Sequence, residues 1–245
     1  MGKILNIETA TRVCSVSLSD NGNVVSIQES KIKNSHAEKI TLFSEQVIYK
    51  SGISFSDLDA IAISKGPGSY TGLRIGVSTA KGFCYSLDIP LISIGTLPAL
   101  AHGMIEKIMK EGKNPENFLF CPMIDARRME VYTALYNHKL EEIKKVEAKI
   151  ITEDSFGTWL QKGKQIIFFG DGASKCKSVL SENLGAVFTE EEFLPSAAYM
   201  ANLAEEKFQK KEFEDVAYFE PFYLKDFIPG IPKVKGLKPE QGDNA

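Results

Sequence analysis

The chain has 245 residues, of which 43% are hydrophobic, and its formal net charge at pH 7 is −3. This length is ample for two compact units with a sizeable core, and the near-neutral charge excludes a strongly basic nucleic-acid-binding protein. The four cysteines form no C-x-x-C pair, and no apolar run approaches the ~18 residues that a membrane span needs. We therefore expect a cytoplasmic protein with reduced thiols and no membrane partner.

The first half of the chain predicts strands followed by alternating helices and strands. Alternating apolar residues and turn signals predict strands at 3–9, 13–19 and 24–29, and the apolar period then changes to that of a helix. The elements expected next are a helix at 35–51, a strand at 59–64, a helix at 71–87, a strand at 91–94 and a helix at 97–109. Three antiparallel strands, a helix, a strand, a helix and a further strand form the unit of the ribonuclease-H-like fold.

A similar order of elements follows a polar, turn-rich stretch at 111–116. Strands are expected at 118–124, 130–136, 140–150 and 165–169, and helices at 153–162, from 174, and at 196–209. We therefore predict an α/β protein of two ribonuclease-H-like subdomains, at 1–110 and 111–228, the second a degenerate copy of the first. Residues 229–245 are rich in Pro, Gly and Lys and are expected to form a mobile tail.

Residues 64–76, with the sequence SKGPGSYTGLRIG, are the most informative segment. A glycine-rich turn between a strand and a helix presents free backbone N–H groups and the positive end of the helix dipole, which suit a phosphate or carboxylate. Arg74 lies in the first helical turn, where it could clamp an anion or a partner's carboxylate. No Gly-Lys-Ser/Thr follows, which excludes a Walker A loop. The same glycines could instead let two backbones approach closely, so both interpretations stay open.

Other residues could complete a nucleotide-binding cleft. Glu8 and Thr9 end the first predicted strand, where a carboxylate could orient a metal ion or water, or could simply be solvated. Gly170 and Gly172 follow a later strand and could form a second phosphate turn or only a sharp turn. The candidate cleft residues are Glu8, Thr9, Gly66, Gly68, Gly170 and Gly172.

The helix after the glycine-rich loop carries small residues at a spacing of four. Gly72, Gly76 and Ala80 would leave a shallow groove that another helix could enter, either within the protein or from a partner. The preceding helix is amphipathic, with an apolar stripe wide enough for more than one neighbour. Together the two helices could form a self-complementary patch for a two-fold dimer.

The sequence contains few recognisable catalytic motifs. The three histidines form no H-x-x-H or H-E-x-x-H arrangement, and there is no G-x-S-x-G turn around a nucleophile. The charged segment 125–132 is either a hairpin with mutual ion pairs or a docking surface for a charged partner. We expect neither a metal site nor catalytic residues in this chain.

Several segments together resemble the TsaB (YeaZ) family. They are residues 4–10, 14–18, 66–76 (GPGSYTGLRIG), 125–132 (DARRMEVY) and 221–224, in order over nearly the whole chain. The resemblance implies the fold of the actin/sugar-kinase/heat-shock-protein-70 superfamily and a role in making N6-threonylcarbamoyladenosine at position 37 of tRNA. It implies a subunit that does not itself transfer the threonylcarbamoyl group but pairs with the catalytic paralogue TsaD, joined by the ATPase TsaE. Contact with tRNA would come only through this complex.

The resemblance also implies where partners dock. Homodimers, and the pair with TsaD, would use the first two helices, at about 36–51 and 71–86. The interface residues expected there are His36, Ile40, Phe43, Val47, Gly72, Arg74, Gly76 and Ala80. The chain would require no cofactor, and ATP or ADP would bind weakly or at the interface of the complex.

Two departures from the family patterns bear on chemistry. Glu8 stands where relatives commonly have aspartate, and residues 95–101 lack the metal-binding histidine pair of TsaD, so that His102 stands alone. The chief alternative is an active ATP-dependent kinase or ATPase of the same superfamily, with Glu8 and both glycine turns around Mg-ATP. A metallopeptidase is a third possibility.

Overall fold

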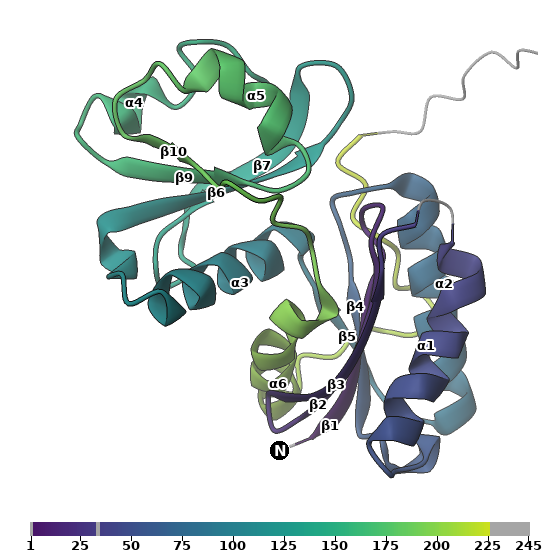
Figure 1. Ribbon diagram of the computed structural model, residues 1–245. Helices are drawn as coiled ribbons and strands as arrows, with labels where there is room; N and C mark the ends of the chain where they lie inside the picture. The colour runs from purple at the N-terminus through teal and green to yellow at the C-terminus, as the bar shows by residue number, and fades with distance from the viewer. Residues whose placement is uncertain (1, 33–34, 226–245) are drawn as a thin grey trace, which may run out of the picture.

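A computed structural model describes residues 2–32 and 35–225 of the chain. Two five-stranded mixed sheets, each flanked by helices, form two lobes that lie side by side (Figure 1). The predicted fold class, two α/β units of this type, is confirmed. The expected tail at 229–245 lies outside the described residues.

The N-terminal sheet has the strand order β3-β2-β1-β4-β5. Its strands are β1 (Lys3–Glu8), β2 (Cys14–Asp20), β3 (Asn23–Ser30), β4 (Ala60–Ser64) and β5 (Leu91–Ile94). β1 pairs antiparallel with β2 and parallel with β4, so that Ile7 lies between Val16 and Ile63. The carboxyl ends of β1, β4 and β5 therefore meet at one edge of the sheet.

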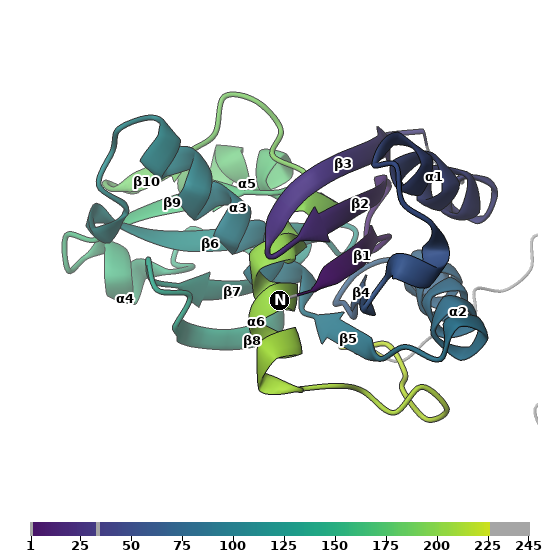
Figure 2. The same ribbon diagram turned by 90° about the horizontal axis from the view of Figure 1, so that it is seen from below.

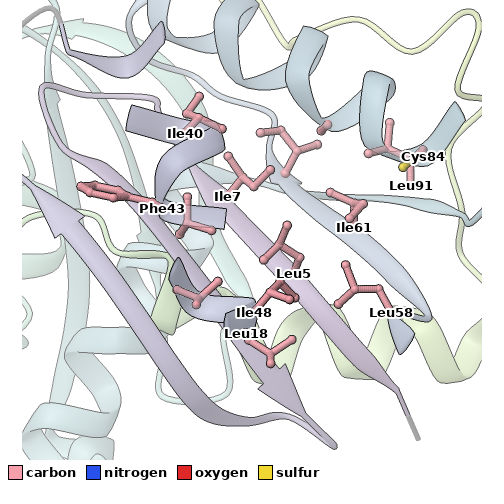
Figure 3. Close-up of a cluster of buried hydrophobic side chains, with 14 of the residues drawn as sticks. Leu5, Ile7, Leu18, Ile40, Phe43, Ile48, Leu58, Ile61, Cys84 and Leu91 are labelled. Carbon is pink, nitrogen blue, oxygen red and sulfur yellow. The ribbon is translucent and has the colours of Figure 1, made fainter. Parts of the chain in front are cut away.

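Helices α1 (His36–Lys50) and α2 (Tyr70–Leu87) cover one face of this sheet. Ile40 and Phe43 of α1 gather with Leu5 and Ile7 of β1 in the buried cluster between helix and sheet (Figure 3). The periodic apolar residues of α1 thus form the core of the N-terminal lobe.

The other face of the N-terminal sheet is covered by the 3-10 turn η3 (Ala197–Met200) and helix α6 (Ala201–Lys210), which come from the far end of the chain. Met200 and Ala204 pack against Ile4 and Ala62. Figure 2 shows α6 next to the N-terminal sheet and facing the other lobe.

The C-terminal sheet has the order β10-β9-β6-β7-β8. Its strands are β6 (Phe118–Asp125), β7 (Glu130–Tyr136), β8 (Glu142–Ile150), β9 (Gln165–Phe169) and β10 (Ala186–Phe188). Helix α3 (Thr96–Lys110) packs on one face through Leu100 and Met104, while α4 (Gly157–Leu160) and α5 (Ala173–Leu180) lie on the other. The boundary at residue 111 stays a prediction, and the packing of α3 and α6 crosses it.

The largest differences from the expected elements lie in the C-terminal half. The helix predicted at 153–162 is reduced to Gly157–Leu160, because a turn closed by the Thr152 N–H and the Ser155 hydroxyl (3.0 Å) occupies its start. The helix predicted at 196–209 begins as the 3-10 turn η3, capped by the Ser196 hydroxyl. Short elements, η1 (Phe55–Asp57), η2 (Pro115–Asn117) and β10, were not predicted. Over the described ranges, no helix has both the length and the apolar character needed to cross a bilayer.

Candidate functional site

A cleft of about 1010 Å³ lies between the lobes, beyond the carboxyl ends of β1 and β4. One wall is formed by the β1–β2 turn at 10–12 and the glycine-rich loop at 67–72, and the other by the β6–β7 turn at 124–127 with Asp171. The segment 222–225 and the residues His36, Ala37, Ile75, Tyr132 and Glu192 complete the lining. Open α/β sheets bind ligands in such crevices outside the carboxyl ends of their strands, which makes this cleft the candidate ligand site.

Glu8, the predicted metal-orienting carboxylate, is fully buried and does not line the cleft. Its Oε1 accepts hydrogen bonds from the Ala10 N–H (2.5 Å) and the Ser64 hydroxyl (3.0 Å). Its Oε2 has no hydrogen-bond partner among the described residues. Burial raises the pKa of Glu8 to about 7, although the hydrogen bonds oppose this shift. The side chain therefore ties the end of β1 to β4, and neither expectation, a solvated carboxylate or a ligand in the cleft, is met.

The glycines at 68, 72 and 76 let the chain pass unusually close to residues 9 and 10. A Cβ on Gly68 would lie under 3.0 Å from the Ala10 carbonyl oxygen, and one on Gly72 equally close to that of Thr9. The Ser69 N–H donates to the same Ala10 carbonyl at 2.6 Å. Close approach of two backbones therefore accounts for these glycines. Of the residues predicted to bind a nucleotide, Gly68 is the one that lines the cleft.

The other predicted cleft glycines also face protein atoms. Gly66 has a φ of +107°, and a Cβ there would lie 2.8 Å from the Phe222 carbonyl oxygen. Gly170 and Gly172 pack against the backbone of β6, and the Gly172 N–H donates to the Met123 carbonyl at 3.0 Å. None of the three lines the cleft. The second turn is thus a sharp turn against β6, and its glycines do not open toward a phosphate in the cleft.

Charged side chains in and beside the cleft pair with residues from distant parts of the chain. Asp171 accepts a hydrogen bond from the Asp125 N–H at 3.0 Å, and burial raises the pKa of the Asp171 carboxyl. Asp125 and Glu130 of the charged segment take their lysine partners from outside the hairpin. The ion pairs are Arg12–Glu192, Lys175–Asp125 and Lys225–Glu130. These contacts link the two walls of the cleft and its C-terminal lining.

The described part of the chain brings together no three His, Cys, Asp or Glu side chains that could hold a metal ion. His102 lies 3.8 Å from Glu106 on the surface of α3, and His138 lies 3.6 Å from Glu116. The four cysteines are buried and unbridged.

The predicted interface residues of α1 belong instead to the interior. The Nε2 of His36 donates to the carbonyl oxygens of Thr11 (2.9 Å) and Val13 (3.2 Å), which fixes the start of α1 to the β1–β2 turn. Ile40, Phe43 and Val47 are buried against the sheet. These four side chains thus pack within their own lobe, with His36 also at the edge of the cleft, and their role in a partner interface stays a prediction.

The small residues of α2 also face their own lobe, and their role in a partner interface stays a prediction. Gly72, Gly76 and Ala80 are buried, and a Cβ on Gly76 would overlap the Thr9 hydroxyl. Their small size lets α2 approach β1 and β4 closely. The expected ridge for a partner helix is therefore a contact within the lobe.

Arg74 is the one predicted interface residue whose side chain is exposed. Its guanidinium lies 4.2 Å from the centre of the Tyr70 ring, and its Nε donates to the Tyr223 hydroxyl at 3.2 Å. The rings of Tyr70 and Tyr223 pack in a tilted arrangement, with an interplanar angle of 38° and ring centres 4.8 Å apart. This cluster joins the start of α2 to the C-terminal segment.

The outward side of α1 and α2 carries exposed aromatic residues that the sequence analysis did not name. We call this surface the outer helix face and define it by Leu42, Tyr49 and Tyr85, with exposed fractions of 47%, 86% and 87%, together with Ser78 and Gly82. No other labelled helix or strand lies over this side of α1 and α2 (Figure 1). The C-terminal segment contacts the flank of α2, where the Lys81 ammonium donates to the carbonyl oxygens of Ala217 and Phe219. The helical spacing of the sequence could have indicated this surface, because two large aromatic residues lie among small ones on the side of the helices opposite the buried stripe.

Comparison with known proteins gives the family. Residues 24–235 match a family model described as "TsaD: tRNA N6-adenosine threonylcarbamoyltransferase". The "tRNA threonylcarbamoyladenosine biosynthesis protein TsaB" of Bacillus subtilis is 30% identical over 227 residues, which cover 91% of this chain and 93% of that protein. The chain belongs to this broad family and, within it, to the TsaB proteins. TsaB of Escherichia coli is likewise 30% identical, over 92% of this chain and 96% of its own length.

Similarity to TsaD itself is shorter. The "tRNA N6-adenosine threonylcarbamoyltransferase" of Bacillus thuringiensis is 33% identical over 128 residues, which are 46% of this chain and 37% of that protein. Among solved structures, "YeaZ from Pseudomonas aeruginosa" has a TM-score of 0.77 at 23% identity, covering 91% of this chain and all of that one. This last similarity supports the fold that TsaB proteins share.

Proposed function

We propose that the chain is a non-catalytic subunit in the synthesis of N6-threonylcarbamoyladenosine at position 37 of tRNA. The named TsaB relatives, matched over more than nine-tenths of their length, support the pathway. The burial of Glu8 away from the cleft and the pairing of Arg12 and Lys175 with carboxylates support a structural use of these groups. The chain then contributes a surface for assembly, while the group transfer takes place on TsaD.

The observation that carries this proposal is the uncovered outer helix face. Tyr49 and Tyr85 expose almost their whole side chains on the outward side of α1 and α2. Exposed aromatic side chains are enriched at protein interfaces, where they bury a large area for little loss of rotamer entropy. TsaD would dock here in the active complex, with TsaE joining the pair, and a second copy of the chain would dock here when TsaD is absent. Contact with tRNA would come through the complex.

The decisive experiment is reconstitution of the complex. The purified chain and TsaD are mixed, the molar mass of the product is measured by light scattering, and tRNA modification is assayed with TsaE and all small-molecule substrates present. We expect a stable heterodimer and a modification rate that depends on this chain. A rate that is the same with and without the chain would contradict the proposed function.

A second candidate, an ATP-dependent kinase or ATPase, is favoured by the size of the cleft and by the two carboxylates, Asp125 and Asp171, that line it. Calorimetry of the isolated chain with Mg-ATP separates the two. We expect weak binding at most, because Arg12 and Lys175 beside the cleft already have carboxylate partners. Micromolar affinity together with phosphate release would favour the enzyme.

A further inference from the structure

A second cavity, of about 500 Å³, lies on the other side of the glycine-rich loop from the cleft. It is bounded by the residues that follow β4 and β5, by α6, and by strands β7 and β8 of the opposite lobe. Pro67 and Phe222 form the wall that it shares with the cleft. None of the residues predicted for the nucleotide site except Gly66 reaches it. It is therefore a distinct candidate site.

The lining of this cavity is largely apolar. Ile94 and Pro98 come from the end of β5 and the start of α3, Val146 from β8, Leu203 from α6, and Phe222 from the C-terminal segment. Pockets of this size and composition, with a few polar groups directed inward, are typical of small-molecule sites. The apolar lining favours a ligand with a hydrophobic body.

Three lysines, Lys65, Lys207 and Lys210, line the cavity, and the first two carry the argument. Lys65 follows β4, and Lys207 lies on α6, where its ammonium donates to the Ser93 carbonyl oxygen at 3.0 Å. Within the described ranges, neither ammonium forms an ion pair with a carboxylate. Partial burial, and next the nearby charge of Lys65, lower the pKa of Lys207, while the carboxylates of Glu212 and Glu214 oppose this shift. Two positive charges are thus held near each other, partly out of water, and the acceptor that Lys207 contacts is a neutral carbonyl.

The acidic side chains of the same cavity do not form ion pairs with these lysines. Glu142 accepts a hydrogen bond from the Val146 N–H at 3.0 Å, and Glu206 and Glu212 lie on α6 and just beyond it. Other lysines of the chain do form close ion pairs, as Lys175 does with Asp125. An anion between Lys65 and Lys207 would offset the repulsion between them and the cost of their burial.

We propose that this cavity binds a small organic anion, with its apolar body against Ile94, Val146 and Phe222 and its anionic head group between Lys65 and Lys207. A carboxylate and a phosphate share the required chemistry, because both accept charge-assisted hydrogen bonds from ammonium groups. The site is independent of the outer helix face and of the cleft that a nucleotide would occupy.

The test uses the dye 1-anilinonaphthalene-8-sulfonate, an aromatic anion whose fluorescence rises in apolar surroundings, with the full chain. We expect saturable binding of one dye per chain. The variants Lys65→Met and Lys207→Met should each weaken it about tenfold, as expected for the loss of one charge-assisted hydrogen bond. Lys162→Met, on an exposed turn of the other lobe, is the matched control and should leave the affinity unchanged.

Neutral N-phenyl-1-naphthylamine has the same aromatic body without the sulfonate and should bind weakly and equally to all variants. Arg127→Met, in the cleft, reports on the other site and should have no effect. Unchanged dye affinity in both lysine variants, tighter binding of the neutral dye, or loss of affinity in Arg127→Met would each overturn the proposal. Should Lys207→Met fail to fold, as judged by its thermal unfolding, Lys65→Met decides alone.

Competition identifies the head group. Displacement of the sulfonated dye by octanoate would assign a carboxylate ligand, and displacement by octyl phosphate would assign a phosphate ligand. Displacement by neither would overturn the assignment of an organic-anion site.

Discussion

The hydroxyl oxygen of Thr9 occupies the space that a Cβ on Gly76 would need. Thr9 follows β1, and Gly76 lies in the second turn of α2, so this relationship sets how closely the helix approaches the sheet. The Thr9 side chain is fully buried and its hydroxyl has no hydrogen-bond partner among the described residues. Little room is available for either group to move aside.

The variant Gly76→Ala should therefore destabilise the protein by about 2 kcal/mol, the usual cost of an added methyl group in a packed interior. Gly82 is the matched control, because it lies in the same helix and a Cβ added there would have no neighbouring atom within 4 Å. Gly82→Ala should stabilise by roughly 0.5–1 kcal/mol through helix propensity alone. Urea denaturation of both variants measures these changes, and equal effects at the two positions would refute the close approach.

The buried carboxyl of Glu8 predicts how stability depends on pH. Its pKa rises from 4.5 to about 7 on folding, so the unfolded chain releases this proton at a lower pH than the folded chain does. Between these values the folded state binds more protons, and its stability falls as pH rises. Above pH 7 the accumulated penalty is about 3 kcal/mol, from about 1.4 kcal/mol per pKa unit.

The variant Glu8→Gln removes this titration while keeping an acceptor for the Ala10 N–H and the Ser64 hydroxyl. We expect the free energies of unfolding of variant and parent to differ little near pH 4.5, and the variant to gain by about 3 kcal/mol relative to the parent by pH 8. Denaturation curves at several pH values measure the difference in unfolding free energy between variant and parent. Other titrating groups contribute equally to both proteins, so their effects cancel in this difference. A difference that does not change with pH would show that Glu8 titrates normally.

The order of the elements was predictable because strand and helix periods are local properties of the chain. The hairpin between β2 and β3 and the helix ending near Gly52 needed only nearby residues. Which helices cover which sheet was not predictable, since α6 packs on the N-terminal sheet although it comes from the far end of the chain. Long-range packing of this kind leaves no signature in local periodicity.

The candidate site illustrates the same limit. The sequence showed that Gly72, Gly76 and Ala80 form a small face, but the same spacing serves a partner helix and the protein's own sheet equally well. In the structure this face packs within the lobe, because the Thr9 side chain, which follows β1 more than sixty residues earlier, fills the space beside Gly76. The role of Glu8 was missed for a related reason, since burial at the end of a strand depends on Ser64 and the layers around it.

The burial of His36 leads to a third prediction. Its Nε2 serves two backbone carbonyls of the β1–β2 turn, so His36→Leu would leave both without this donor. We expect a loss of about 1–3 kcal/mol in the free energy of unfolding, the cost of leaving buried polar groups unsatisfied. His138→Leu is the control and should change stability by less than about 0.5 kcal/mol, because that ring is part of a surface pair with Glu116. A stable His36→Leu protein that no longer binds TsaD would restore the interface role first expected for this residue.

The outer helix face gives the last prediction. Tyr85 exposes 87% of its surface on α2, and an arginine at this position should leave the fold intact while placing an uncompensated charge in the interface with TsaD. We expect Tyr85→Arg to weaken the heterodimer by roughly 2 kcal/mol, or about thirtyfold, the size of effect seen at an interface hot spot. Leu184→Arg is the matched control, since Leu184 is 95% exposed but lies in the turn before β10, in the other lobe. Sedimentation of each variant with TsaD measures the affinity, and equal binding by both variants would show that TsaD docks elsewhere on the molecule.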